Sequence, residues 1–449
     1  NKSQTAMKKI YFILCFLTTF YGSAKVIESK SSELPNIILI MADDMGYECI
    51  GANGGTSYAT PNIDNMAKKG VRFEHCYSNP ACTPSRVQIM TGRYNVYNYT
   101  RFAQLKRGET TFAHLLKDAG YTTCIAGKWQ LGQKLDAPQH FGFDQSLLWQ
   151  HTRGNFTNAT KTDTRYENPQ LERNGVKEEY HNGEFGPDVI VDYIGAFIQA
   201  NKDGPFLVYY PMMLPHSPFV PNPDSVDWNP KSKGAKRGSM DPKYFDDMVR
   251  YTDKMVGRVI QQVEDAGLAD NTYLFFTSDN GSLGNIVSQV NGKQIRGGKG
   301  KMSNAGTHVP LVVLGPGIPE GQVSEDLVDF TDFLPTFCEI SGVKTKEEAG
   351  FNGISFLSQL HGHNTHRREF IYCWYQVPSF MKKNFPGIKD LSYTRNQRYK
   401  LYRDGSFYDV RNDMLETNDL SMNDHNQELV LIRDRMFALI EKHDGFRSD

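Results

Sequence analysis

The sequence predicts an α/β fold: a large, doubly wound, mostly parallel sheet domain followed by a smaller C-terminal α+β subdomain of antiparallel sheet plus helix. Three observations predict it. Short unbroken apolar runs recur along the first 345 residues, helical patterns lie between them, and the chain then changes to short strand-like segments and one closing helix. We therefore expect a leader at 1–24, the α/β domain at 25–345 and the C-terminal subdomain at 346–449.

Five apolar runs are the expected strands of the large domain, at residues 37–41, 122–126, 206–210, 273–276 and 311–314. Unbroken apolarity is typical of strands that are buried on both faces, as in a parallel sheet covered by helices. Between these runs we expect helices at 61–69, 110–119 and 242–266. The first of these helices has Thr60-Pro61 at its start and Gly70 at its end, which are common start and stop residues.

The C-terminal subdomain is expected from segments 370–375 and 400–403, which resemble short antiparallel strands, with a turn at Asp404-Gly405. A helix at 427–442 closes the chain.

The first 24 residues have the layout of a secretory signal peptide behind a short overhang. Lys8-Lys9 forms a basic stub, residues 10–21 are apolar, and Gly22-Ser23-Ala24 supplies small residues for cleavage. A buried N-terminal helix is the alternative. We expect a secreted or periplasmic protein without a membrane span, since no run reaches the length that a span needs.

Composition excludes several classes of protein. The chain carries 50 Lys+Arg against 51 Asp+Glu, a net charge of -1, so the basic excess of a dedicated nucleic-acid binder is missing. Its 39% hydrophobic residues are enough for a large core. The cysteines beyond the leader are widely spaced without a CxxC pair, which indicates neither a zinc knuckle nor a disulfide scaffold.

Polar residues follow four of the expected strands. They are Asp43-Asp44, Gly127-Lys128-Trp129-Gln130, Pro215-His216-Ser217-Pro218 and Asp279-Asn280. Ligands bind outside the carboxyl ends of the strands in an open α/β sheet, so these groups are expected to converge there. Asp43, Asp44, Asp279 and Asn280 offer oxygen ligands alone, which suits Ca²⁺ or Mg²⁺, whereas Zn²⁺ normally recruits His or Cys.

The segment Cys82-Thr83-Pro84-Ser85-Arg86 is the other candidate. Thr83 and Pro84 favour a helix start, which would place Cys82 at a helix N-terminus, where backbone N–H groups attract anions. A lone cysteine taken by itself is more often a small buried hydrophobe.

With these segments the chain resembles the type I, formylglycine-dependent sulfatase family of the alkaline-phosphatase-like superfamily. Residues 82–86 fit its Cys-x-Pro-Ser-Arg signature, and residues 120–132 are similar to its second signature. Pro215-His216-Ser217-Pro218, Thr277-Ser278-Asp279-Asn280-Gly281 and Arg296-Gly297-Gly298-Lys299-Gly300 are similar to its other active-site segments, in the same order. The resemblance extends over residues 36–418 and makes 25–345 the catalytic domain.

The resemblance implies a catalyst in which Cys82 is oxidised to formylglycine (3-oxoalanine) by a formylglycine-generating or anaerobic maturation enzyme of the host. The hydrated aldehyde would attack sulfur and form a covalent sulfo-enzyme intermediate. Ca²⁺, favoured over Mg²⁺, would be bound by Asp43, Asp44, Asp279, Asn280 and residue 82.

The resemblance also implies roles for four further side chains. Arg86 would stabilise the formylglycine, and Lys128 and Lys299 would bind the sulfate oxygens. His216 would contact the ester oxygen and, as a group titrating near neutrality, protonate the departing alcohol.

One position departs from the family. The second signature usually continues Gly-Lys-Trp-His, where this chain has Gln130. Glutamine cannot act as a base, although its carbonyl can accept a hydrogen bond. This departure keeps open a catalytically silent glycan-binding protein, and a phosphonate monoester hydrolase or phosphodiesterase of the same superfamily is the other alternative.

The function we expect is hydrolysis of sulfate esters on a sulfated polysaccharide or oligosaccharide. The export signal motivates this substrate class, since extracellular sulfate esters are chiefly glycans. Algal glycans such as ulvan or carrageenan and animal glycosaminoglycans both remain open.

Overall fold

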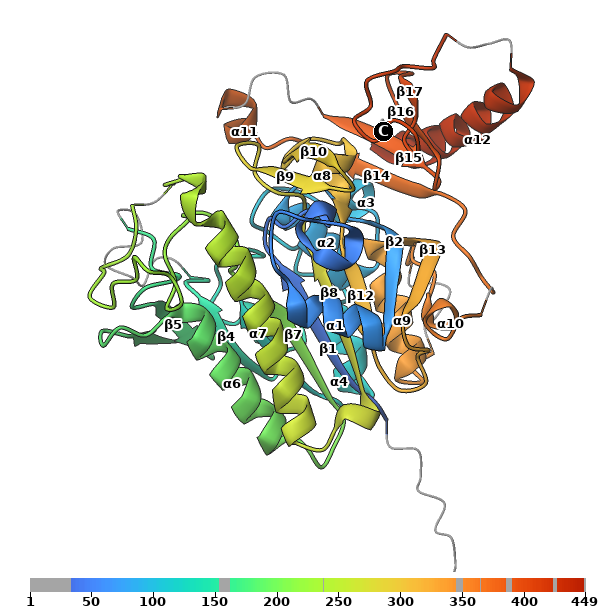
Figure 1. Cartoon of the computed structure of the whole chain (residues 1–449). Helices are drawn as coiled ribbons and strands as arrows, with labels where there is room; N and C mark the ends of the chain where they lie inside the picture. The colour runs from blue at the N-terminus through green and yellow to red at the C-terminus, as the bar shows by residue number, and fades with distance from the viewer. Residues whose placement is uncertain are drawn as a thin grey trace, which may run out of the picture. The chain divides into compact units, whose positions relative to one another are not determined.

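The computed structural model describes residues 34–152, 162–236, 238–344, 350–363, 365–384, 390–422 and 426–447. Within these ranges eleven strands form one large sheet and four more form a small one (Figure 1). The expected leader at 1–24 lies outside the described residues, so the signal peptide stays a prediction. No helix within the described ranges has the length and apolarity that crossing a membrane requires.

The centre of the large sheet is parallel. Its strands run in the order β8 (Thr272–Ser278), β1 (Asn36–Ala42), β7 (Phe206–Pro211), β3 (Thr122–Gly127) and β4 (Gln145–Trp149). Every residue of β1, β7 and β8 is buried, which explains why the sequence shows unbroken apolar runs there. The four parallel strands expected at 37–41, 122–126, 206–210 and 273–276 are confirmed.

Both edges of the large sheet contain antiparallel pairs. Beyond β4 lie β5 (Gln170–Arg173) and β6 (Val176–Glu179), and beyond β8 lie β12 (Leu311–Leu314), β2 (Val71–Tyr77) and β11 (His308–Val309), with β13 (Gln322–Asp329) parallel to β2. The strand at 311–314 is confirmed, but it runs antiparallel to β8.

The connection between β8 and β12 explains this direction. It carries the hairpin of β9 (Val287–Val290) and β10 (Lys293–Arg296) and the one-turn helix α8 (Asn304–Thr307), and it has no long crossover helix. A parallel neighbour requires such a crossover. The chain therefore returns into the sheet at the end where β8 leaves it.

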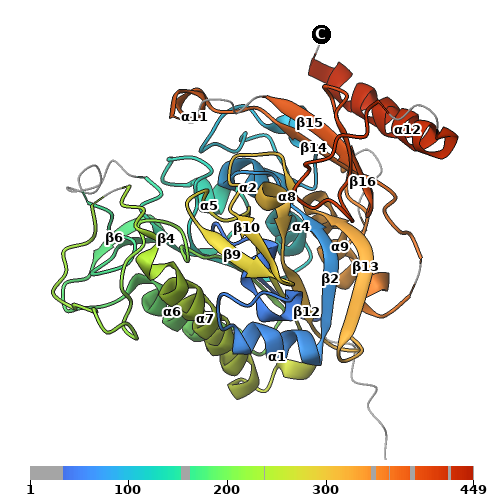
Figure 2. The ribbon, with the colours of Figure 1, turned by 45° about the horizontal axis from the view of Figure 1, so that its top comes forward.

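Helices cover both faces of the sheet (Figures 1 and 2). On one face lie α1 (Pro61–Lys69), α6 (Gly186–Ala200) and α7 (Phe245–Asp265), and on the other lie α2 (Cys82–Thr91), α4 (Phe112–Asp118) and α9 (Phe333–Ile340). Shorter helices are α3 (Asn95–Asn98), α5 (Ala137–His140), α10 (Leu357–Leu360) and α11 (Ser379–Asn384). Single 3₁₀ turns lie at Tyr47–Cys49, Gly51–Asn53, Pro242–Tyr244, Ala269–Asn271, Phe330–Asp332 and Gly445–Arg447.

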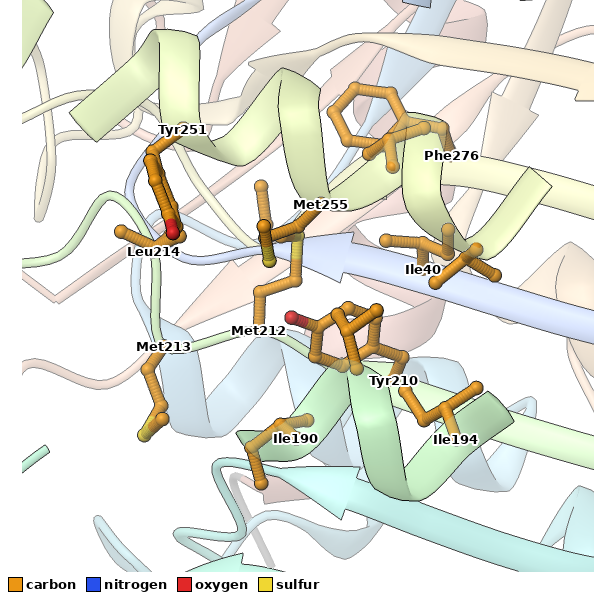
Figure 3. Close-up of a cluster of buried hydrophobic side chains, with 14 of the residues drawn as sticks. Ile40, Ile190, Ile194, Tyr210, Met212, Met213, Leu214, Tyr251, Met255 and Phe276 are labelled. Carbon is orange, nitrogen blue, oxygen red and sulfur yellow. The ribbon is translucent and has the colours of Figure 1, made fainter. Parts of the chain in front are cut away.

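The core on the first face is built by every second residue of the strands, whose side chains pack against the apolar sides of α6 and α7. Figure 3 shows Ile190 and Ile194 of α6 and Met255 of α7 beside Ile40 and Tyr210 of the strands. Because this layer holds β1, β7 and β8 side by side, their carboxyl ends are fixed relative to one another.

The C-terminal part contains an antiparallel sheet of β14 (Ile371–Tyr375), β15 (Leu391–Arg395), β16 (Tyr399–Tyr402) and β17 (Phe407–Asp409), covered by α12 (Gln427–Asp444). It shares a buried cluster with the large domain, which includes Ile371 and Tyr393 of the small sheet and Tyr77 and Met302 of the large domain. The antiparallel sheet and closing helix are confirmed, and the boundary at 345/346 stays a prediction.

Candidate active site

The carboxyl ends of neighbouring strands carry the expected acidic residues. Asp43 and Asp44 follow β1, and Asp279 and Asn280 follow the adjacent β8, so residues more than 230 positions apart meet at one edge. All four side chains are 0% exposed. The Asp44 backbone N–H donates to Asp279 Oδ1 at 3.2 Å, and Asn280 Nδ2 donates to Asp44 Oδ1 at 2.8 Å. Asp44 adopts a left-handed φ of 68°, a strained conformation of the kind found at functional sites.

Cys82 lies against these carboxylates. It opens α2, as expected, and no side chain caps this helix end at Ala81. Its Sγ lies 3.4 Å from Asp43 Oδ1 and 3.8 Å from Asp44 Oδ1. One ligand atom each from Asp43, Asp44, Cys82 and His216 fits within 4.8 Å of the others, a spacing that can hold a metal ion.

An unmodified Cys82 is poorly suited to act as a nucleophile. Burial, together with the negative charge of Asp279, raises the pKa of its thiol well above the ordinary value. The reactive form of cysteine is the thiolate, and this environment suppresses it. The site therefore does not support cysteine chemistry of the protease type.

Three cations pair with the three carboxylates. Lys128, directly after β3, brings Nζ to 2.6 Å from Asp43 Oδ2, and Lys299 Nζ lies 2.6 Å from Asp44 Oδ2. Arg86 comes one helical turn after Cys82, and its Nη2 donates to Asp279 Oδ2 at 2.9 Å. Each carboxylate of the site thus has one cationic partner, and of the three cations only Lys299 is partly exposed.

The titration of the acidic residues reflects this pairing. Burial alone would raise the pKa of Asp43, but the charges of Lys128 and Arg86 hold it well below its usual range. Burial and the charge of Asp43 raise the pKa of Asp279 to about 7. The two carboxyl groups are therefore unequal, and Asp43 is the more firmly ionised.

Lys299 is placed by a tight glycine loop after β10. A Cβ at Gly297 would lie 2.2 Å from the Leu283 carbonyl oxygen, so the loop approaches that backbone too closely for another residue. The Lys299 N–H donates to Ser282 O at 3.0 Å, and the Gly300 N–H donates to Pro80 O at 2.7 Å. These two bonds tie the loop to the segments that carry Asn280 and Cys82.

His216 joins the site from the segment after β7. Its Nε2 lies 3.6 Å from Asp44 Oδ2, and Arg165 Nη1 lies 2.8 Å from its Nδ1. Burial lowers the pKa of His216 to about 3, even though Asp43 and Asp44 oppose this shift. These surroundings disfavour the charged ring, whereas the sequence-based expectation is a group that titrates near neutrality.

Gln130 lies close to Lys128, one of the two sulfate-binding candidates. It shares a small cavity with Lys128, Trp149 and His151 and has a left-handed φ of 55°. Its buried Oε1 accepts no hydrogen bond from any residue in the described ranges.

Arg165 and the residue that holds it, Asp163, were not predicted from the sequence. Both lie in an irregular segment after β4 that matches no motif and follows no periodic pattern. A buried Asp-x-Arg pair has no sequence signal that separates it from a surface ion pair.

Comparison with known proteins gives consistent matches over most of the chain. The family described as Sulfatase matches residues 35–343, and the one described as N-sulphoglucosamine sulphohydrolase, C-terminal, matches residues 298–442. Mouse N-acetylgalactosamine-6-sulfatase is 30% identical over 369 residues, which cover 75% of this chain and 68% of that protein. A protein of Formosa agariphila named Sulfatase is 27% identical, covering 94% of this chain and 91% of its own length.

Solved structures show the same fold. The crystal structure of Ps i-CgsB superposes with a TM-score of 0.76 at 25% identity and covers 92% of this chain and 93% of its own. A structure described as a complex with its substrate D-glucosamine-2-N,6-O-disulfate superposes with a TM-score of 0.73 at 21% identity, covering 92% of this chain and 99% of its own.

Proposed function

This chain belongs to the sulfatase family, and on that premise we propose that it removes sulfate groups from a sulfated carbohydrate at the cluster around Cys82. Hydrolysis of sulfate esters follows from the family membership itself. The observation that carries the placement of the reaction is the meeting of Asp43, Asp44 and Asp279 with Cys82 and two lysines in one buried cluster.

The donor set fits a hard divalent cation. Asp43, Asp44 and Asp279 supply carboxylate oxygens, and Asn280 supplies Oδ1, which is buried and receives no hydrogen bond from any described residue. Because Asn280 Nδ2 already donates to Asp44, Oδ1 is the ligand atom left for a cation. These four residues and residue 82 would hold Ca²⁺, which accepts irregular oxygen sets more readily than Mg²⁺.

Residue 82 is the proposed nucleophile once oxidised to formylglycine. A hydrated aldehyde at this position would offer a hydroxyl, made more acidic by a cation held by the neighbouring carboxylates, as the group to attack sulfur, and the thiol lacks this chemistry. Cys82 is 2% exposed in the fold. The maturation enzyme must therefore act before this part of the chain is buried.

The cationic side chains of the site have separate proposed roles. Lys128 and Lys299 bind the sulfate oxygens, because their ammonium groups lie against Asp43 and Asp44, the two carboxylates that Cys82 contacts. Arg86 orients residue 82 and Asp279. It lies on α2, the helix that begins with Cys82, and it donates to Asp279 and to the Lys128 carbonyl. The three positive charges compensate the charge of the sulfate group as it is transferred.

His216 is the proposed partner of the departing oxygen. Its Nε2 lies 3.6 Å from Oδ2 of Asp44 and so faces the carboxylate cluster. A hydrogen bond from Nε2 to the ester oxygen would stabilise the charge that develops there as the S–O bond breaks.

The relatives support the carbohydrate substrate. Several are named N-acetylgalactosamine-6-sulfatase, and one related structure is described as a complex with k-i-k-neocarrahexaose. We propose the same substrate class for this chain. We also propose that the protein is secreted or exported to the periplasm, where it would meet such glycans.

Matched substrate assays test this proposal. We expect protein matured in the presence of Ca²⁺ to release sulfate from a glycosaminoglycan or carrageenan oligosaccharide with a kcat/KM at least about tenfold above that for 4-nitrophenyl sulfate, since contacts to the sugar add transition-state binding. A phenyl phosphonate ester should be slower than either sulfate. A preference for the phosphonate would favour the hydrolase alternative, and glycan binding without sulfate release would contradict the proposal.

A further inference from the structure

The contact between Arg165 and His216 is the observation from which we infer a further role. Arg165 Nη1 lies 2.8 Å from His216 Nδ1 with its N–H directed at that nitrogen. The remainder of the guanidinium is fixed, because Nε donates to Asp163 Oδ1 and Nη2 donates to Asp163 Oδ2, each at 2.8 Å. The carbon at its centre also lies 4.2 Å from the ring centroid of Trp149.

Arginine carries only donors and stays charged, so it can meet an imidazole nitrogen only where that nitrogen offers a lone pair. On the other side of the ring, Nε2 faces the carboxylate of Asp44, which accepts but cannot donate once ionised. Both neighbours therefore favour the same tautomer, with the lone pair on Nδ1 and the proton on Nε2.

One contact opposes this arrangement. The carbonyl oxygen of Ser217 also lies within hydrogen-bond distance of His216 Nδ1 and would accept a proton from it. That arrangement would turn an N–H of the ring against the N–H of Arg165. Because Arg165 is charged and held by Asp163 on its other edge, its donor decides the tautomer.

We propose that Arg165, held by Asp163, is a positioning residue that keeps the lone pair of His216 on Nδ1 and a proton on Nε2, so that Nε2 donates a hydrogen bond to the oxygen leaving sulfur. This rests on the proposed role of His216 and adds to it the group that sets its direction. Without Arg165 the ring can present the bare Nε2 lone pair to the ester oxygen, and that contact is repulsive.

Kinetics with two leaving groups test the inference. The hydrogen bond matters most for a sugar alcohol, a poor leaving group, and least for 4-nitrophenol, which departs without assistance. We expect Arg165→Ala to lower kcat for a sulfated sugar by about 10²-fold, the scale of one positioned proton donor, and kcat for 4-nitrophenyl sulfate by much less. Arg165→Lys keeps a cationic donor and should restore part of the loss.

The control is Arg173→Ala, which removes an arginine that pairs with Glu178 on the β5–β6 hairpin and should change neither rate. His216→Ala serves as the reference. If it slows both substrates equally, the role of His216 in the proposed function fails and the inference fails with it. If His216→Ala is selective for the sugar and Arg165→Ala is not, the inference about Arg165 alone is wrong.

A measurement on the unmutated enzyme covers the case in which Arg165→Ala does not fold. Nitrogen-15 NMR of the matured, Ca²⁺-loaded protein labelled at histidine separates protonated from unprotonated ring nitrogens, and the His216 signals are assigned by their loss in His216→Gln. We expect an unprotonated Nδ1 and a protonated Nε2. A protonated Nδ1, bonded to Ser217, would overturn the proposal.

Discussion

Lys299→Ala is expected to lower kcat/KM for sulfate esters by about 10²–10³-fold, the range measured when one charge-stabilising donor is removed from an active site. Lys299 Nζ lies 2.6 Å from Asp44 Oδ2 in the buried cluster, and the acidic neighbours raise the pKa of this ammonium group, led by Asp44. These acidic neighbours therefore favour the charged form of Lys299, against the opposing effect of burial. The alanine variant loses that charge where the sulfate oxygens would bind.

Lys301→Ala is the matched control, because Lys301 lies two residues further along the same loop and its side chain is exposed. It should retain the activity of the unmutated enzyme. Initial rates and the thermal unfolding midpoint of each variant are the measurements. A Lys299→Ala enzyme that is folded and as active as Lys301→Ala would contradict a sulfate-binding role for Lys299.

Removal of divalent cations is expected to abolish sulfate release and to lower the thermal unfolding midpoint. The buried oxygens of Asp43, Asp44, Asp279 and Asn280 would then lose the cation that they bind together. A cation present at a hundred times its dissociation constant stabilises a protein by about 2.7 kcal/mol. Dialysis against a chelator, followed by calorimetry and rate assays during titration with Ca²⁺ or Mg²⁺, measures both effects, and Ca²⁺ should restore them at the lower concentration.

Asn280→Ala and Asn285→Ala separate a specific site from general ion effects. Asn280 offers the unshared Oδ1, whereas Asn285 is exposed and donates to the Met240 carbonyl. Only Asn280→Ala should require a higher Ca²⁺ concentration to reach the same thermal unfolding midpoint. Unchanged activity and stability in the chelated enzyme would show that the cluster works without a cation.

The sequence predicts the acidic edge of the sheet because the rule behind it is simple. Unbroken apolar runs become parallel strands buried on both faces, and the polar residues after parallel strands meet at one edge. Asp43 and Asp279 therefore had predictable neighbours, although they are separated by more than 230 residues. Cys82 at the start of α2 follows from the local preferences of Thr83 and Pro84.

Other features depend on tertiary structure that local patterns do not encode. The direction of β12 is set by the missing crossover helix. Strand β2 was not predicted, because its partly alternating residues resemble those of many half-buried segments. Burial lowers the pKa of His216, and Arg165 reaches its Nδ1 from a segment 51 residues away. A motif can identify His216, but it cannot show which neighbour faces its second nitrogen.

The chemical state of residue 82 tests the central claim most directly. Trypsin cleavage after Arg72 and Arg86 releases peptide 73–86, which contains both Cys76 and Cys82 and so carries its own control. In active enzyme, mass spectrometry should find Cys76 as a thiol that alkylates after unfolding, and an aldehyde at position 82 that reacts with a hydrazide probe. Fully active protein in which both positions are alkylated cysteines would contradict the account.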